Sequence, residues 1–313
     1  MKRLYKNLFL MSLALLVVVL SSCSGSDYLN AIPKKSTALI SVDLQQMASD
    51  KNAEDKAGML KSLLHVDDVD KCGIDISEKL YLFESADGNL GLCAKVSDEG
   101  DVEDWLASLA KKRIASEVKE RKGFHFSVLK DSWLVGFSGQ ALLVMGPVVA
   151  DAQAQLQQQM VKYLKAEEED GITVSPMYER LQTLSSPMAM VAQAQALPEK
   201  FVAPFTLGAP KDTDPSQVVI AADMEVKDGI LQIQGETFSF NETIDKALQK
   251  AVQNYRPIKG SYVKSMPDDA LAGIFMNVNG EQFLPMMQSN RSLQTLLMGI
   301  NQAVDMDNIM RSV

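Results

Sequence analysis

The sequence predicts an α+β protein with mainly antiparallel sheets and with helices packed on one face. Strand-like segments are interspersed with amphipathic helical ones, and several consecutive strands are joined by short turns. Strict strand–helix–strand units, which would indicate a parallel sheet, are rare. The 313 residues are 46% hydrophobic and 23% charged, which is ordinary for a chain that buries a sizeable core.

The first 22 residues have the features of a bacterial lipoprotein signal peptide. Basic residues precede an apolar run over residues 8–20, which is too short for a spanning helix of about 20 residues. A Leu-Ser-Ser-Cys motif ending at Cys23 follows and resembles the lipobox that lipoprotein signal peptidase reads. We therefore expect cleavage before Cys23 and lipidation of its thiol, with acyl chains such as palmitate holding the protein to a membrane.

The residue after the expected lipidation site favours the outer membrane. Ser24 stands where an Asp would be the usual signal for retention in the inner membrane. Cleavage would remove three of the 31 basic residues and leave 28 against 40 acidic ones, a net charge near −12. Such a surface repels nucleic acid and anionic lipid headgroups, so neither is an expected partner. Attachment on the periplasmic face and attachment on the cell-surface face of the membrane are both compatible with these features.

Strands and helices of the first half follow from periodicity and turn residues. The β-branched segment 37–44 predicts a strand, and Asp43 with Gln46 predicts a helix cap at its end. An apolar stretch over residues 59–64 predicts a second helical segment. Further strands are expected over 79–85, 90–96, 124–129, 132–137 and 141–145, with helices from Asp101 and over 151–165.

The second half repeats this mixture of elements. The acidic run 167–170 is interpreted as a solvated loop and a candidate boundary. Asn241 is expected to cap a helix, because Asn favours this position and an apolar stripe follows it. The elements expected before it are a helix over 176–184, a strand over 188–194 and a hairpin of strands 217–226 and 230–240.

Residues near both ends of the chain predict an internal duplication. Segment 28–44 aligns with 262–278 at a constant offset, with identical Tyr, Pro, Ala and Ile positions and with Asp43 opposite Asn277. The second copy is incomplete at Val313, so the chain is either shortened or uses the partial copy as added strands and helices. The expected organisation is a signal peptide (1–22), a first α+β unit (23–170), a second α+β segment (171–255) and a partial repeat of the first unit (256–313).

Three segments carry a resemblance to a known family. A lipidated cysteine followed by segment 27–33, the strand 38–43 and the later stretch 275–281 resembles uncharacterised Gram-negative, Bacteroidetes-type envelope lipoproteins, a domain of unknown function. The resemblance spans most of residues 23–313 and rests on turn and strand signatures. Family members are usually longer, which favours a shortened C-terminus. The family brings no established activity, so the resemblance implies no catalytic or binding residue.

No residue constellation indicates a metal or a cofactor. His65 and His125 lie in no metal-binding motif, and both are interpreted as structural. The segment that begins at Asp68 starts like a calcium loop, but Cys72 and Lys79 occupy two ligand positions, so a turn is the simpler interpretation. Cys72 and Cys93 are either a disulfide or two buried thiols.

The sequence therefore favours a non-catalytic binding or scaffold module that recruits an unknown protein or glycan ligand at the membrane. We assign no catalytic, cofactor-binding or metal-binding residue. The rival hypothesis is an envelope hydrolase in which two carboxylates converge in space and act as acid and base. The ligand and the oligomeric state stay open.

Overall fold

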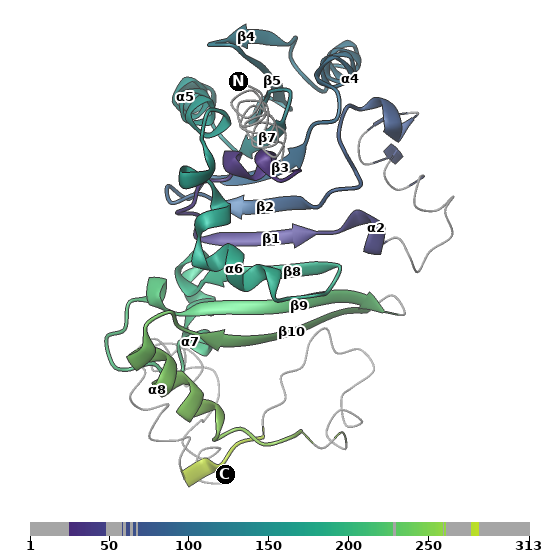
Figure 1. Cartoon of the computed structure of the whole chain (residues 1–313). Coiled ribbons are helices and arrows are strands. Elements are labelled where there is room, and N and C mark those ends of the chain that lie inside the picture. The colour runs from purple at the N-terminus through teal and green to yellow at the C-terminus, as the bar shows by residue number, and fades with distance from the viewer. Residues whose placement is uncertain are drawn as a thin grey trace, which may run out of the picture. The chain divides into compact units, whose positions relative to one another are not determined.

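The computed structural model describes residues 25–47, 58, 61–62, 65–66, 68–227, 230–258, 260 and 277–281 (Figure 1). The chain divides into two compact units. One consists of residues up to Ser36 together with Ile40–Glu179, and the other of Thr37–Leu39 and the residues from Arg180 onward. Strand β1 (Ala38–Val42) contributes residues to both units.

The first unit is built on an antiparallel sheet. Each neighbouring pair of the six strands that follow β1 in spatial order runs antiparallel. The predicted α+β class with antiparallel strands is therefore confirmed. In that order the strands are β2 (Leu80–Glu84), β3 (Leu90–Lys95), β7 (Ala141–Gly146), β6 (Trp133–Phe137), β5 (Phe124–Leu129) and β4 (Lys119–Arg121).

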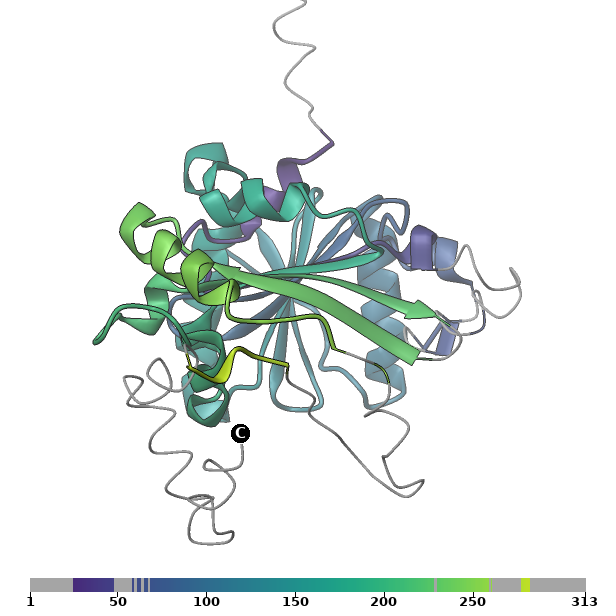
Figure 2. The same ribbon diagram turned by 90° about the horizontal axis from the view of Figure 1, so that it is seen from below.

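Helices of the first unit cover both faces of its sheet, whereas the sequence suggested one covered face. Helix α4 (Glu99–Lys111) packs against a cluster that contains Phe137, and α4 is the blue helix to the right of the strands in Figure 2. Helix α5 (Gln153–Leu164) approaches the opposite face, because a Cβ at Gly136 would lie 3.1 Å from the methyl carbon of Met160. Since successive residues of a strand face opposite sides, Gly136 and Phe137 mark the two covered faces.

Helix α4 forms where its periodicity predicts it. Asp98 caps the helix, because its carboxylate accepts a 3.0 Å hydrogen bond from the backbone N–H of Asp101. Four apolar residues on one stripe of the helix are buried: Val102, Trp105, Leu106 and Leu109.

The chain enters the first unit through a buried 3-10 turn, η1 (Asp27–Ala31). Tyr28 and Leu29 are 4% and 2% exposed, and Ile32, directly after the turn, is fully buried. This short segment is therefore part of the core and not a loose linker. The acidic residues 167–170 lie beside it, since Lys34 forms a 3.3 Å ion pair with Asp170.

The second unit contains three antiparallel strands, β8 (Met188–Gln193), β9 (Val219–Lys227) and β10 (Ile230–Phe238). Two helices, α7 (Glu199–Phe205) and α8 (Glu242–Val252), contribute to its core. Asn241 caps α8 as predicted, accepting hydrogen bonds from the backbone N–H groups of Thr243 and Ile244. The remaining elements are α2 (Leu44–Met47), α6 (Pro176–Gln182), η2 (Val69–Lys71), η3 (Ala150–Ala152), η4 (Glu168–Asp170), η5 (Ile172–Val174), η6 (Ala194–Ala196) and η7 (Pro215–Gln217).

The two aligned polar residues of the expected duplication make different contacts. The carboxylate of Asp43 accepts a 2.8 Å hydrogen bond from the N–H of Gln46, which is the predicted cap. The side-chain amide of Asn277 instead donates a 2.6 Å hydrogen bond to the carbonyl of Pro257. Most of the second copy, including residues 261–276 and 282–313, lies outside the described residues. The duplication and the domain boundaries drawn from it stay predictions.

Among the residues described, none of the helices is both long enough and apolar enough to cross a membrane.

Candidate functional site

The predicted lipidation site, Cys23, lies outside the described residues, and its lipidation stays a prediction. Gly25, two residues later, is described and exposed. A Cβ at this glycine would lie 3.5 Å from a carboxylate oxygen of Glu78 and 3.7 Å from the ammonium of Lys95. Gly25 therefore lies beside the ion pair of Glu78 and Lys95.

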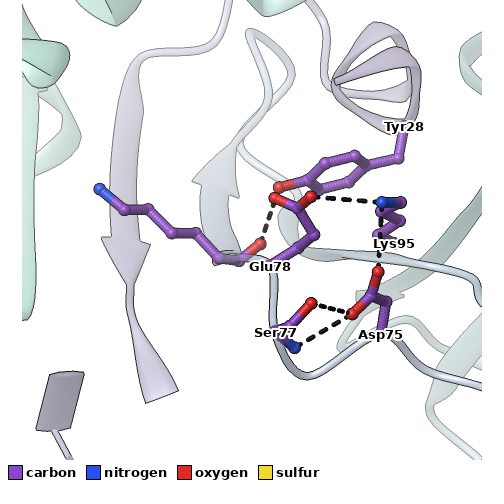
Figure 3. A network of polar contacts seen from close by, with 6 residues as sticks. Tyr28, Asp75, Ser77, Glu78 and Lys95 are labelled. Carbon is purple, nitrogen blue, oxygen red and sulfur yellow. Dashed lines mark hydrogen bonds and ion pairs between the residues drawn. The ribbon is translucent and has the colours of Figure 1, made fainter. Parts of the chain in front are cut away.

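Lys95 joins two carboxylates at this point of the first unit (Figure 3). Its Nζ lies 3.1 Å from Asp75 Oδ2 and 3.2 Å from Glu78 Oε1. The other oxygen of Asp75 accepts hydrogen bonds from the hydroxyl and the backbone N–H of Ser77. The bond from the Ser77 hydroxyl, followed by those from Lys95 and from the Ser77 backbone, holds the pKa of Asp75 below its ordinary value.

Tyr28 packs beside the same network and fixes the η1 turn. Its hydroxyl donates a 2.9 Å hydrogen bond to the backbone carbonyl of Lys79, and its own carbonyl accepts one from the thiol of Cys93. Burial raises the pKa of Tyr28 well above its ordinary value, so the hydroxyl keeps its proton. These two hydrogen bonds of Tyr28 connect η1 to the sheet.

The two carboxylates that contact Lys95 do not suit acid–base hydrolysis. Both Asp75 and Glu78 contact the same ammonium group, and a depressed pKa keeps Asp75 ionised at neutral pH. A general acid needs the opposite, a pKa raised toward the working pH.

The two histidines occupy different local structures. His125 Nδ1 lies 3.2 Å from Glu99 Oε1, and its ring stacks on that of Phe137 with the centroids 5.2 Å apart. The backbone carbonyl of His65 accepts a hydrogen bond from the side chain of Lys112. In the part of the chain that the structure describes, no three His, Cys, Asp or Glu residues gather where they could hold a metal ion.

Cys72 and Cys93 are both buried, and neither forms a disulfide. Cys72 belongs to the cluster under α4, together with Ala94. Cys93 directly precedes Ala94 in β3 and therefore points to the other face, where its thiol meets Tyr28. The sheet thus separates the two sulfur atoms, which excludes a disulfide between them in this fold.

A surface pocket of about 650 Å³ lies along one flank of α5, and we call it the glutamine pocket. The amide nitrogen of Gln159 lies 2.6 Å from both Asp87 Oδ2 and the hydroxyl of Tyr163. Burial raises the pKa of Tyr163, so its hydroxyl is neutral and can donate. The lining residues are Asp87, Asn89, Val148, Ala152, Gln155, Leu156, Gln158, Gln159, Lys162 and Tyr163.

A second pocket of about 360 Å³ lies along another flank of α5, and we call it the basic pocket. Lys119 and Arg121 of β4 contribute two positive charges to it, and Glu117 contributes one negative charge. Its lining residues are Ser116, Glu117, Lys119, Arg121, Phe126, Ser127, Val128, Leu134, Ala150, Gln153, Ala154 and Gln157.

Every glutamine of α5 lines one of these two pockets. Gln153 and Gln157 line the basic pocket, and Gln155, Gln158 and Gln159 line the glutamine pocket. The sequence identifies a Gln-rich helix here but assigns it no role. The missed signal is that only a narrow stripe of this helix is apolar, so its amides remain on the surface.

The chain matches a known family over residues 28–313, which is most of its length: domain of unknown function (DUF4836). It belongs to this family.

No curated protein matches this DUF4836 chain. Among solved structures, crystal form IV of TP0453 is similar with 12% identity and a TM-score of 0.41, covering 67% of this chain and 79% of that one. Crystal form III of TP0453 gives 11% identity and a TM-score of 0.38, covering 74% and 89%. Similarities of this size do not define the fold or the site of the DUF4836 chain.

Proposed function

We propose that this DUF4836 protein is a lipid-anchored, non-catalytic binding module of a Bacteroidetes-type Gram-negative outer envelope. The basic and apolar segments before Cys23, and the lipobox that ends there, support the anchor. Ser24 supports the outer membrane over the inner one.

The glutamine pocket is the ligand site in this proposal, and the hydrogen-bonded group of Gln159, Asp87 and Tyr163 is the observation that carries it. These side chains come from α5 and from the turn between β2 and β3, and their mutual hydrogen bonds hold them in place before a ligand arrives. A site with positioned polar groups loses less conformational entropy on binding than a loose one.

The chemistry of the lining favours a neutral, polyhydroxylated ligand such as a glycan. Amide groups both donate and accept hydrogen bonds, as sugar hydroxyls do, and Gln155, Gln158 and Asn89 add three of them. The single acid, Asp87, and the single cation, Lys162, leave the lining without net charge. A strongly charged ligand therefore has no electrostatic advantage in this pocket.

The hydrolase alternative lacks a matching pair of acids in this pocket. Glycoside hydrolysis uses two carboxyl groups roughly 5 to 9.5 Å apart on either side of the scissile bond. The glutamine pocket contributes only Asp87, which is already hydrogen bonded to Gln159. Binding without bond cleavage is the function that this geometry supports.

The binding proposal is tested by titrating maltohexaose, cellohexaose and xylohexaose into the Cys23→Ala protein and following heat or tryptophan fluorescence. We expect Gln159→Ala and Tyr163→Phe each to weaken binding about 5- to 10-fold, the equivalent of one hydrogen bond. Gln157→Ala, on the other flank of α5, is the matched control and should bind normally. No binding of any of these oligosaccharides, or equal binding by Gln159→Ala, would refute the proposal.

The anchor is tested separately, by expressing the full chain in a Gram-negative host. The wild-type protein should sediment with membranes after a carbonate wash, and Cys23→Ala should not. Mass spectrometry should find acyl chains on a polypeptide that begins at Cys23. A wild-type chain without acyl groups would contradict the anchor and leave the binding test unaffected.

A further inference from the structure

The basic pocket lies beside an edge strand whose cations face α5. In the register of β4 and β5, Lys119 is opposite Phe126 and Arg121 is opposite Phe124. Cross-strand partners lie on the same face of a sheet, and Phe126 is the residue that a Cβ at Gly136 would meet on the α5 side. Lys119 and Arg121 therefore project from β4 on the side of the sheet that carries α5.

A third cation, Lys165, follows the C-terminal end of α5. The ammonium of Lys165 lies over the ring of Phe124, 5.7 Å from its centroid. Phe124 is also the cross-strand partner of Arg121. Lys119 and Arg121 are the two cations that line the pocket itself, and Lys165 adds a third positive charge beside β5.

These cations have no acidic partner in the described part of the chain. Ion pairs are formed there by Lys34, Lys71, Lys95, Arg180 and Lys246. Lys119, Arg121 and Lys165 form none, although the chain carries 40 acidic side chains. Unpaired cations of this kind raise the local concentration of anions, against the negative sign of the whole chain.

The hydrogen-bonding groups of the pocket also favour an acceptor-rich ligand. Ser127 donates to the carbonyl of Ser116, Ser116 donates to that of Glu117, and Gln153 donates to that of Asp131. The two hydroxyl donors and one of the two N–H groups of Gln153 are therefore occupied within the protein. The charged groups of Lys119 and Arg121 remain to meet a ligand beside the amide of Gln157, and both charged groups are donors without acceptor capacity.

We propose that the basic pocket binds a phosphate group, carried either by a lipid or by a soluble phosphate ester. Phosphate oxygens only accept hydrogen bonds when ionised, so they match a guanidinium fork and an ammonium group. Glu117 is the one carboxylate of the lining, and its charge opposes phosphate binding. This site does not depend on the glutamine pocket or on its ligand.

The first experiment titrates sn-glycerol 3-phosphate into the Cys23→Ala protein at low salt, followed by calorimetry. Lys119→Gln with Arg121→Gln should weaken binding by about 10-fold or more, since two charge-assisted hydrogen bonds are lost. Glu117→Gln should tighten binding, because it removes the opposing charge. The matched control is Lys111→Gln with Lys112→Gln at the C-terminal end of α4, which removes the same charge away from the pocket and should leave binding unchanged. Unchanged thermal unfolding shows that each variant is folded.

The second experiment separates the two sources of phosphate. Vesicles of phosphatidylcholine with and without phosphatidic acid are sedimented with the same proteins. Sedimentation that requires phosphatidic acid and both pocket cations assigns the phosphate to a lipid, whereas binding of glycerol phosphate alone assigns it to a soluble ester. The proposal is overturned if neither probe binds, or if the pocket variant and the α4 control bind equally.

Discussion

The hydroxyl of Tyr28 donates a 2.9 Å hydrogen bond to the backbone carbonyl of Lys79, 51 residues further along the chain. The bond ties the η1 turn to the residue that directly precedes β2. Tyr28→Phe should lower the free energy of unfolding by about 1 kcal/mol, since the ring stays packed and one hydrogen bond is lost. Urea unfolding followed by tryptophan fluorescence measures this loss, because both tryptophans, Trp105 and Trp133, lie in the first unit. An unchanged midpoint would show that the bond contributes nothing.

The contacts among Lys95, Asp75 and Glu78 predict loss of stability at both ends of the pH scale. Because the folded pKa of Asp75 is lowered from its ordinary 3.8, its contribution is present above that value and disappears as the pH falls through the lower, folded one. The raised pKa of Lys95, caused first by its hydrogen bond to Asp75, gives a contribution present below its ordinary 10.5 and lost above the folded value.

Asp75→Asn tests both limbs of this dependence. Thermal unfolding of the variant should depend less on pH on the acid side, and on the alkaline side the contribution of Lys95 should shrink because its first partner is gone. Asp104→Asn, at an exposed position of α4, is the control and should keep the wild-type profile. Identical acid limbs in Asp75→Asn and the wild type would contradict the role of Asp75.

Gly136 has no room for a side chain. A Cβ there would lie 2.6 Å from the ring of Phe126 and 3.1 Å from the methyl carbon of Met160. Gly136→Ala should destabilise the first unit by about 1–3 kcal/mol, as overpacking of a dense core does. In Gly139→Ala the new methyl would meet only Glu99, at 3.5 Å, so the expected change is within about 0.5 kcal/mol. Equal midpoints for the two variants in urea would disprove the close packing of α5 on β6.

The thiols of Cys72 and Cys93 should be present but unreactive in the folded protein. Both are buried, and burial raises the pKa of Cys93, so little thiolate forms. In the Cys23→Ala background, a disulfide-exchange reagent such as DTNB should detect two thiols only after denaturation, with or without prior reduction. Finding none before reduction would indicate a disulfide and a different arrangement of β3.

Regular elements were predictable because each has a local signal. The alternation and turns of the strands and the capping residue of α8, Asn241, mark elements that the structure places within a few residues of the expected bounds. Strand β4 was missed because Lys119, Glu120 and Arg121 are all exposed and show no apolar alternation. It exists because β5 offers its backbone groups at the edge of the sheet.

The two covered faces of the first unit had a signal that the prediction did not use. Strands β6 and β7 are apolar at successive positions, from Leu134 to Phe137 and from Ala141 to Val144. A strand that is apolar on both sides is buried on both faces, which requires helices above and below it. The expectation of a single helical layer ignored this continuity.

The pockets were beyond the reach of the sequence, because their residues are far apart in the chain. Asp87 and Gln159 meet only after the hairpin of β2 and β3 has been placed beside α5. The basic pocket combines a three-residue edge strand with a helix that begins 32 residues after it. No local pattern reports such contacts, and the negative charge of the whole chain pointed away from an anion site.

The place where the chain leaves the first unit limits how an acylated protein could move. Gly25 lies beside the Lys95 and Glu78 side chains, and two residues span at most about 7 Å, so a lipid on Cys23 would be no further than this from Gly25. A connection this short would let the folded protein rotate about its lipid anchor but would keep it close to the bilayer. A ligand of the anchored protein would then be bound within one molecular diameter of the lipid surface.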